Sequence, residues 1–322
     1  MKHLMDKLEC KIDGETFDTE KELHKHLRKH KIRVAEYYQK YYPRHDKHNG
    51  EMIKFKNKDQ YFSTEFNTKT NLRMWLKSLS EEDAKEYCKN LLLSRKEKKE
   101  LTYAPSQVEL RSIMSPPVQF YDELFGDYYR LCNELGFKNK HGKFMDIVSG
   151  SEYNKPEYKV FVDTREQKPL KFKRGIEVRT LKFGDYAFSS KMATCNCYIE
   201  RKSLSDLIGT LSGGYERLCN EIKRAQEDDA YLVILVEAKF SRAMYFNQQF
   251  KSHNKERVFK KVKATPEFIF HRIRRLIQKY PNIQFLFVDG RREASRVTER
   301  IFTAGCAHER ADLQLAYDLK KL

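Results

Sequence analysis

The sequence predicts an α/β domain over residues 158–304, in which helices flank a mixed β-sheet, and a mainly α-helical region before it. Three observations support this fold class. Short β-rich or apolar runs, typical of strands covered on both faces, occur at 158–162, 232–236 and 285–288. Further extended segments lie at 176–183 and 197–201, and helical patterns at 203–211, 214–227, 265–280 and 290–303. Strands that alternate with helices are typical of an α/β domain with a central sheet.

The region before residue 158 is polar and contains several turn signals. Helical periodicity is visible in it near 19–30, 69–78, 81–99 and 118–135. Gly142, Gly150 and Pro156 favour a linker over 139–157. We therefore expect modules at 1–32, 33–138 and 158–304, and a C-terminal helix or tail over 305–322.

The charge of the chain favours a polyanionic partner. Lys and Arg number 63 against 46 Asp and Glu, which gives a formal net charge of +17. No apolar run approaches the roughly 18 residues that a membrane helix needs, and the first residues lack the apolar core of a secretory signal. The seven cysteines form no Cys-x-x-Cys pair and are expected to be free thiols in a reducing compartment. We expect an intracellular protein without a membrane partner, in the host cytoplasm if viral and in the nucleus if eukaryotic.

A spaced series of acidic and basic residues between Asp163 and Asp206 is the strongest functional signal. It comprises Val162-Asp163-Thr164-Arg165-Glu166 at the end of a predicted strand, then Gly184-Asp185, Glu200-Arg201-Lys202 and Asp206. If 185–189 and 197–202 are neighbouring strands, Asp185 and Glu200 converge at one end of the sheet, where their repulsion favours a bound cation. Carboxylate oxygens suit Mg²⁺ or Mn²⁺.

The basic residues beside these acids supply the remaining parts of phosphodiester hydrolysis. Glu200 and Lys202 lie on the same strand face because side chains alternate. A lysine beside a metal-bound carboxylate can orient water or neutralise the charge that develops on phosphate, while Arg165 and Arg201 can hold phosphate or the acids. Ordinary surface ion pairs are the alternative, and they explain any one of these residues better than the whole series.

At these residues the sequence resembles the XPF-type structure-specific nucleases, a branch of the restriction-endonuclease-like fold. Gly184-Asp185, Glu200-Arg201-Lys202 and Asp206 match the family's GD…ERKxxxD signature, and residues 162–166 match its VDxRE segment. The resemblance covers roughly residues 156–305. It implies a divalent-metal-dependent DNA endonuclease that cuts at junctions of duplex and single strand, and pairing of nuclease domains as a homodimer or heterodimer. Family members usually carry helix-hairpin-helix modules after the nuclease domain, for which the residues after 302 are too few, so we expect DNA targeting from the first 150 residues.

The resemblance also implies roles for single residues. Asp163, Asp185 and Glu200 would hold Mg²⁺ or Mn²⁺, with Glu166 beside them. Arg165, Arg201 and Lys202 would be the basic members of the catalytic centre, and Asp206 its closing acid. Tyr215 and Arg217 match the family's basic turn and following helix, where DNA is contacted. Lys96 and Lys98, in the charged run 95–100, are further candidates for DNA phosphate, and the alternative for them is a solvated helix end.

A second candidate metal site lies near the N-terminus. Cys10, Asp13, His26 and His30 have the spacing C-x2-D-x12-H-x3-H. This is the spacing of a two-Cys two-His zinc finger with the second cysteine replaced by aspartate. Because aspartate binds zinc through oxygen, the four residues can form a zinc site in a degenerate finger-like module over 1–32. The alternatives are a metal-free ββα remnant and a chance pattern.

Residues 105–137 resemble the small helical repeat that accompanies many homing endonucleases. The features are Pro105-Ser106, the Phe125-Gly126 turn and the closing Gly136-Phe137. Such a repeat would be a helix-turn-helix-like DNA-binding unit. The alternative is an ordinary small helical domain.

These features together predict a metal-dependent DNA endonuclease that hydrolyses phosphodiester bonds at branched or flap DNA, in DNA repair or recombination. We find no phosphate-loop, dinucleotide or nucleophile-elbow motif and expect no organic cofactor. Two alternatives stay open: a sequence-directed homing-type endonuclease, and a non-catalytic DNA-binding subunit of a nuclease heterodimer. The combination of a finger, a homing-type repeat and a nuclease indicates a phage or mobile-element origin.

Overall fold

The computed structural model describes residues 8–142, 158–173, 175–190, 196–247, 263–303 and 311–322. The chain divides into two compact bodies. The N-terminal body comprises Met1–Tyr87 with Met114–Pro116, and the C-terminal body comprises Cys88–Ile113 with Pro117–Leu322. Most of the expected linker 139–157, and residues 305–310 of the expected tail, lie outside the described residues.

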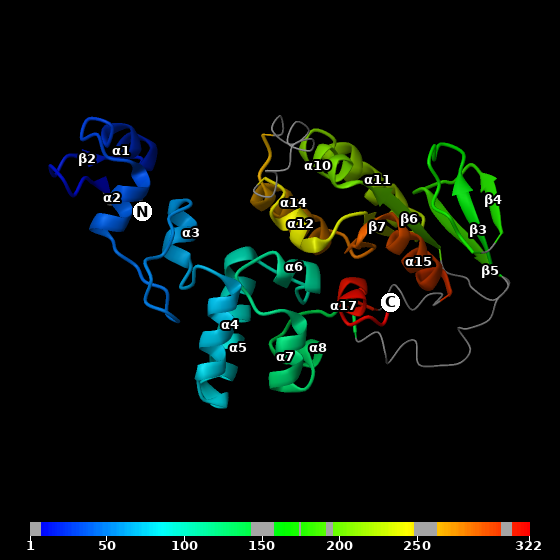
Figure 1. The fold of residues 1–322 in the computed structure, drawn as a ribbon, viewed down its shortest axis with the longest axis horizontal. Helices are drawn as coiled ribbons and strands as arrows, with labels where there is room; N and C mark the ends of the chain where they lie inside the picture. Colours follow the sequence, from blue (N-terminus) through cyan, green and yellow to red (C-terminus); the bar gives the residue numbers. More distant parts are fainter. Residues whose placement is uncertain (1–7, 143–157, 174, 191–195, 248–262, 304–310) are drawn as a thin grey trace. The chain divides into compact units, whose positions relative to one another are not determined.

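The N-terminal body begins with a small ββα unit. Strand β1 (Leu8–Glu9) pairs antiparallel with β2 (Thr16–Phe17), and α1 (Glu20–His26) follows, capped by Thr19 in a capping box with Glu22. The remaining helices are α2 (Val34–Tyr41), α3 (Lys58–Ser63) and α4 (Lys69–Ser78) (Figure 1). Leu23 and Leu27 of the ββα unit share one core with Tyr37 of α2 and Tyr61 of α3. The ββα unit is therefore packed into a larger body and does not close its core alone.

The C-terminal body is built on a six-stranded mixed sheet of order β4-β3-β5-β6-β7-β8. The strands are β3 (Tyr158–Asp163), β4 (Ile176–Arg179), β5 (Tyr186–Ser190), β6 (Cys197–Lys202), β7 (Tyr231–Val236) and β8 (Ile283–Phe287). Strand β5 is antiparallel to both of its neighbours, β3 and β6, and the other pairs are parallel. The start of β5 therefore lies beside the ends of β3 and β6.

Helices cover both faces of this sheet (Figure 1). The face called here the α10 face packs against α10 (Leu204–Ser212), α11 (Tyr215–Glu227), α12 (Phe240–Met244) and α14 (Pro266–Lys279). The opposite face, called the α15 face, packs against α15 (Gly290–Thr303) and α17 (Leu313–Asp318). Along β7, Leu232 and Ile234 lie in the first core, whereas Val233 and Leu235 lie in the second. This arrangement confirms the predicted mixed sheet flanked by helices.

A mainly helical segment precedes the sheet, as predicted. It contains α5 (Glu81–Lys99), which has residues in both bodies, and the short helices α6 (Gln107–Arg111), α7 (Val118–Phe125) and α8 (Tyr128–Glu134). The helix expected over 118–135 is divided at Gly126, whose φ of +82° ends α7. The buried Asp312 accepts hydrogen bonds from the Gln107 N–H (2.7 Å) and the Tyr129 hydroxyl (3.0 Å). Helices α6 and α8 are therefore tied to the start of α17 through buried polar contacts.

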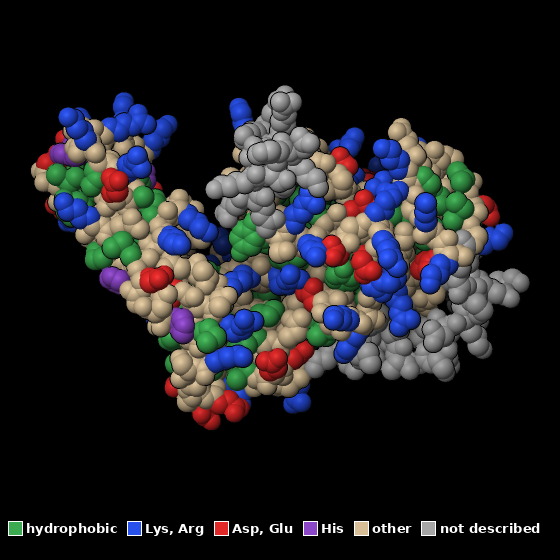
Figure 2. Space-filling view, in the orientation of Figure 1, with side chains coloured by type: hydrophobic (Ala, Val, Ile, Leu, Met, Phe, Trp, Pro, Cys, Tyr) green, Lys and Arg blue, Asp and Glu red, His purple; other side chains and the backbone are tan. Residues whose placement is uncertain are grey.

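Three general properties bear on the sequence predictions. None of the described cysteines forms a disulfide, and Cys10, Cys88 and Cys132 are buried. Within the described ranges, no helix combines the length and the apolar character needed to cross a membrane. Lys and Arg side chains are spread widely over the face drawn in Figure 2, in line with the basic composition.

Candidate active site

Three acids form a row across the end of the sheet. Val162 pairs with Tyr186, and Tyr186 pairs with Ile199. The next residues along these strands, Asp163, Asp185 and Glu200, therefore lie opposite one another and on the same face. Glu200 pairs with Ile234 on its other side, which identifies this face as the α10 face. The structure thus brings together the three acids singled out in the sequence.

The backbone around Asp185 fixes its carboxylate toward β6. The Asp185 N–H donates to the Ile199 carbonyl (2.8 Å), and its Oδ2 accepts a hydrogen bond from the Arg201 N–H (2.8 Å). The preceding Gly184 has a φ of +60°, and a Cβ there would lie 2.9 Å from the Ile199 carbonyl oxygen. A glycine is therefore required before Asp185, because the turn approaches β6 too closely for a side chain.

The charges on this face are incompletely balanced. Burial and the neighbouring Glu200 raise the pKa of Asp185 to about 7. Lys202 Nζ donates to Glu200 Oε1 at 2.5 Å, and both side chains are largely shielded from solvent. Glu221 of α11 is a third acid of this group, and burial and the charge of Glu200 raise its pKa as well. Crowded carboxylates of this kind are stabilised by a cation, and their oxygens suit Mg²⁺ or Mn²⁺.

Asp163 differs from the other two acids because its carboxylate is already saturated. Its Oδ1 accepts from the Arg165 N–H (2.8 Å) and Nε (2.6 Å), and its Oδ2 accepts from the Leu181 N–H (2.7 Å) and Arg165 Nη2 (3.1 Å). Burial alone would raise the pKa of Asp163, but the hydrogen bonds from Arg165 and Leu181 outweigh it and lower the pKa. Asp163, which the sequence predicts to be a metal ligand, therefore links the end of β3 to the residues that follow β4.

Arg165 stays accessible beside this row. Its side chain is 69% exposed, although it is hydrogen-bonded to Asp163. The bond to Asp163 raises the pKa of Arg165, and the charges of Asp185 and Glu200 act in the same direction. The guanidinium is therefore available to an anion that approaches the acidic row.

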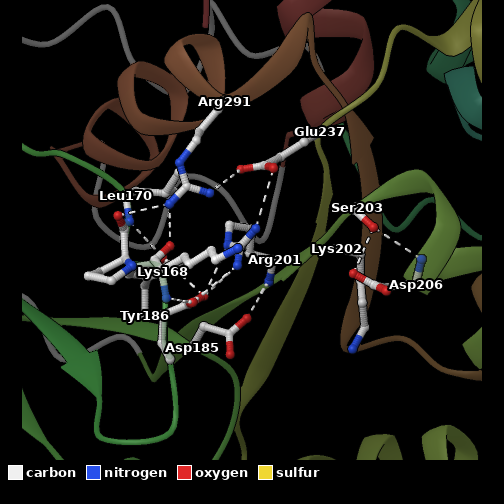
Figure 3. A network of polar contacts seen from close by, with 12 residues as sticks. Lys168, Leu170, Asp185, Tyr186, Arg201, Lys202, Ser203, Asp206, Glu237 and Arg291 are labelled. Atoms are coloured by element: carbon white, nitrogen blue, oxygen red, sulfur yellow. Dashed lines mark hydrogen bonds and ion pairs between the residues drawn. The ribbon is translucent and has the colours of Figure 1, made fainter. Parts of the chain in front are cut away.

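Arg201 lies on the other face of the sheet, in a closed ionic network (Figure 3). Its guanidinium donates to both oxygens of Glu166 (3.0 and 3.1 Å) and to Glu237 (3.3 Å). Arg291 also reaches Glu237 (3.4 Å), and the Tyr186 hydroxyl donates to Glu166 (3.3 Å). These acids have cationic partners within the protein, so Arg201 acts on the framework of the site through Glu166 and Glu237.

The remaining predicted residues lie on α10, α11 and α5. Asp206 is exposed at the start of α10, where Ser203 Oγ donates to its carboxylate (2.7 Å) and accepts from its N–H (3.1 Å). Tyr215 and Arg217 begin α11; Arg217 is exposed, whereas Arg272 stacks on the Tyr215 ring at 4.3 Å. Lys96 Nζ donates to the carbonyls of Leu135 (2.9 Å) and Gly136 (2.8 Å), and Lys98 is exposed.

Sequence reasoning missed Glu221, Glu237 and Arg291. Glu237 directly follows the buried strand β7, and Asp163 is the last residue of β3, so the position of Glu237 after the run 231–236 was an available signal. Glu221 lies beside the buried Ile222 on an amphipathic helix, and nothing in its spacing distinguishes it from a solvated acid. Arg291 reaches the network from α15, a contact that only the tertiary structure reveals.

The candidate ligands of the N-terminal body also come together. One ligand atom from each of Cys10, Asp13, His26 and His30 lies within 4.8 Å of all the others. Asp13 Oδ2 lies 3.0 Å from His26 Nε2 and 2.9 Å from His30 Nε2, and the two Nε2 atoms are 3.0 Å apart. The ligand atoms of a tetrahedral zinc site lie roughly 3.3–3.8 Å apart. The Asp13 oxygen and the two histidine nitrogens are thus slightly closer together than the ligand atoms of a zinc site, and the four residues have the required donor atoms.

Comparisons with known proteins concern the sheet and its helices. Residues 162–301 match the family model described as the ERCC4 domain. A stretch of 98 residues, 29% of this chain and 10% of the relative, is 37% identical to the DNA repair endonuclease XPF of Drosophila melanogaster. XPF from Aeropyrum pernix, alone and in complex with DNA, is similar at 21% and 20% identity over 44% of this chain, with TM-scores of 0.31 and 0.30. The chain covers 63% and 62% of those two structures, and a small part of the fly protein.

The fold is an α/β domain with a mixed sheet whose end carries a row of acids. More particularly, the family match identifies residues 162–301 as an ERCC4 domain, and the fly relative agrees with it. The XPF-type nuclease domain expected from the sequence is confirmed.

Proposed function

We propose that this chain is a divalent-metal-dependent DNA endonuclease, a phosphodiester hydrolase that cuts branched or flap DNA. The observation that carries the proposal is the pair of neighbouring acids, Asp185 and Glu200, whose charges act on each other, with Lys202 hydrogen-bonded to Glu200. The ERCC4-domain match supports a nuclease, and the fly relative supports a setting in DNA repair or recombination inside the cell. Pairing with a second copy or a related subunit through the nuclease domain belongs to the same proposal.

Each residue of the site has a defined part in this mechanism. Asp185 and Glu200 would hold Mg²⁺ or Mn²⁺, which when bound polarises the scissile phosphate and makes a water more acidic. Asp185 is held in place by the Arg201 N–H, so its carboxylate needs little reorganisation. Lys202 neutralises negative charge that develops on the phosphate. The exposed Arg165 contacts a neighbouring phosphate oxygen, because Asp163 anchors it next to the row.

Cleavage of a panel of end-labelled DNAs by the purified chain tests this function. The panel contains a plain duplex, a 3′-flap, a fork and a four-way junction, each with Mg²⁺, Mn²⁺ or no added metal. We expect metal-dependent cuts confined to the branched molecules. A fixed cut in the plain duplex would favour the sequence-directed alternative, and binding of every substrate without cleavage would favour the non-catalytic subunit.

We propose zinc for the cluster of Cys10, Asp13, His26 and His30. The donor set contains one thiolate sulfur, one carboxylate oxygen and two imidazole nitrogens, all of which are ligands of zinc in proteins. His26 is buried and its Nε2 points to Asp13 and His30, so a cation at this point would relieve the crowding of three ligand atoms. A metal here would join the β1–β2 hairpin to α1.

Zinc content by mass spectrometry of the purified chain tests this assignment. We expect about one zinc per chain, lost in Cys10→Ser and retained in Cys219→Ser, a cysteine of the other body. Equal zinc content in both variants would contradict the zinc assignment. So would the absence of zinc from the parent protein after expression and dialysis in zinc-containing solutions.

A further inference from the structure

Helix α1 and the residues after it line a basic cleft on the surface of the N-terminal body. The cleft has a volume of about 530 Å³, and four of its lining residues are the cations Lys21, Lys25, Arg28 and Arg33. All four are exposed, and no carboxylate belongs to the described lining. Figure 2 shows Lys and Arg side chains gathered over this end of the body, where Figure 1 places α1.

The spacing of these residues separates two faces of one helix. Lys21, Lys25 and Arg28 are four and three residues apart, so they lie in one stripe. Leu23 and Leu27 point into the core, and His26 and His30 point to the candidate zinc cluster. The inner face of this segment therefore holds the body together, and the outer face is left with basic side chains.

The basic side chains of the cleft are not neutralised within the described part of the chain. Two nearby carboxylates are bound to the backbone: Glu22 accepts from the Thr19 N–H (3.0 Å), and Glu36 accepts from the Arg33 N–H (3.1 Å). Glu20 lies 3.4 Å from Lys58 Nζ and 3.5 Å from His24 Nε2. Among the described residues, none of the four cations forms an ion pair. The cleft thus gathers four cations that have no ion pair within the described part of the chain.

We propose that this cleft binds the phosphate backbone of DNA, outside the catalytic centre. The proposal rests on the proposed function, because a DNA nuclease needs a site that holds its substrate away from the acidic row. Lysine and arginine side chains that contact phosphates release condensed counterions, which is the main source of sequence-independent affinity for DNA. A membrane surface fits less well, since interfacial binding needs an exposed apolar helix face and the apolar face of α1 is buried.

Binding of a fluorescent 3′-flap DNA and a plain duplex, measured by anisotropy without added divalent metal, tests the cleft. The cleft variant replaces Lys21, Lys25, Arg28 and Arg33 with glutamine. The control variant makes the same change at four exposed lysines of the same body outside the lining, Lys40, Lys54, Lys56 and Lys77. Four lost phosphate contacts should reduce the slope of log K against log salt by about 3 to 4. We expect Kd at 0.1 M salt to rise roughly tenfold or more in the cleft variant, on both DNAs.

The outcomes separate this proposal from the proposed function. Equal losses of affinity in the two variants, or none in the cleft variant, would overturn the cleft as a DNA site. Tighter binding of the parent protein to vesicles that contain phosphatidylserine than to DNA would also overturn the proposal. Single-turnover cleavage at saturating DNA should be the same in parent and cleft variant; no cleavage by the parent would contradict the nuclease and leave the binding comparison intact. If the fourfold variant does not fold by circular dichroism, the pairs Lys21→Gln with Lys25→Gln and Arg28→Gln with Arg33→Gln give the same test.

Discussion

Adjacent residues of β6 lie on opposite faces of the sheet, and the acids on the two faces differ in their charged partners. On the α10 face, Glu200 lies opposite Asp185, and Lys202 donates to Glu200. On the α15 face, Arg201 binds Glu166 at 2.9 Å and Glu237 at 3.3 Å. In the first group, burial and the charge of Glu200 raise the pKa of Asp185, whereas the acids of the second group are compensated by arginine. A contiguous Glu-Arg-Lys sequence thus contributes to a crowded group of acids on one face and to an arginine-compensated network on the other.

The largest expected effect comes from neutralising the acids of the α10 face. Asp185→Asn and Glu200→Gln each keep the size of the side chain, and the asparagine oxygen can still accept the Arg201 N–H. We expect single-turnover cleavage of a flap DNA to fall at least 1,000-fold, about 4 kcal/mol in activation free energy. DNA affinity should stay within about threefold, because binding depends mainly on phosphate contacts by lysine and arginine. Glu177→Gln, on the exposed edge strand β4, is the matched control and should cleave like the parent.

A substitution on the α15 face should lower the stability of the fold more than it lowers the cleavage rate. Arg201→Met removes the arginine that pairs with Glu166 and leaves Glu237 with Arg291. Loss of one partner of a buried ion pair costs about 3–5 kcal/mol. We expect the free energy of unfolding in urea to fall by about 3 kcal/mol, the lower end of that range. Arg300→Met, at an exposed position of α15, should change it by less than about 0.5 kcal/mol. Equal stability of the Arg201 variant and the parent would contradict the compensated network.

Asp163 provides a test that depends on pH. Its pKa is lowered in the folded protein, so the stabilisation is complete above the ordinary value of 3.8 and is lost as the pH falls through the folded-state pKa. Asp163→Asn should cost about 2 kcal/mol at pH 7, since hydrogen bonds to a charged group are replaced. The difference between parent and variant should shrink as the pH falls below 4. A difference that is constant from pH 7 to pH 3 would show that the charge of Asp163 is not what stabilises the fold.

Asp206 should show the smallest effect among the signature acids. Its carboxylate takes part in the cap of α10, and asparagine can accept the same hydrogen bond from Ser203. Asp206→Asn should lower stability by at most about 0.5–1 kcal/mol and change the cleavage rate less than about threefold. A 100-fold loss of cleavage would instead place Asp206 among the catalytic acids, as the family resemblance implies.

Local patterns were sufficient to predict much of the fold. The runs 232–236 and 285–288 were readable as strands because both faces of β7 and β8 are covered, so their residues are continuously apolar. The helices at 69–78 and 81–99 match α4 and α5. The expected strand 176–183 ends early, at Arg179, because the Leu181 N–H turns to the Asp163 carboxylate.

The proximity of Asp185 and Glu200 could be predicted because they lie on neighbouring strands. The charged partners of each acid could not be predicted from the sequence. Which acid stays uncompensated depends on the face that each side chain occupies and on groups far along the chain. Arg201 meets Glu166 and Glu237, and Glu200 lies near Glu221 of a separate helix. These contacts arise from the tertiary fold, and no spacing in the sequence contains them.

The central claim is that Asp185 and Glu200 together hold a divalent cation that drives cleavage of DNA. The most direct test measures the single-turnover rate of flap cleavage against Mg²⁺ concentration for the parent, Asp185→Asn and Glu200→Gln. The account predicts a rate that rises to saturation with Mg²⁺ in the parent and is lost in both variants at every concentration. Cleavage by both variants at the parent's rate, or a parent rate that does not depend on Mg²⁺ or Mn²⁺, would contradict it.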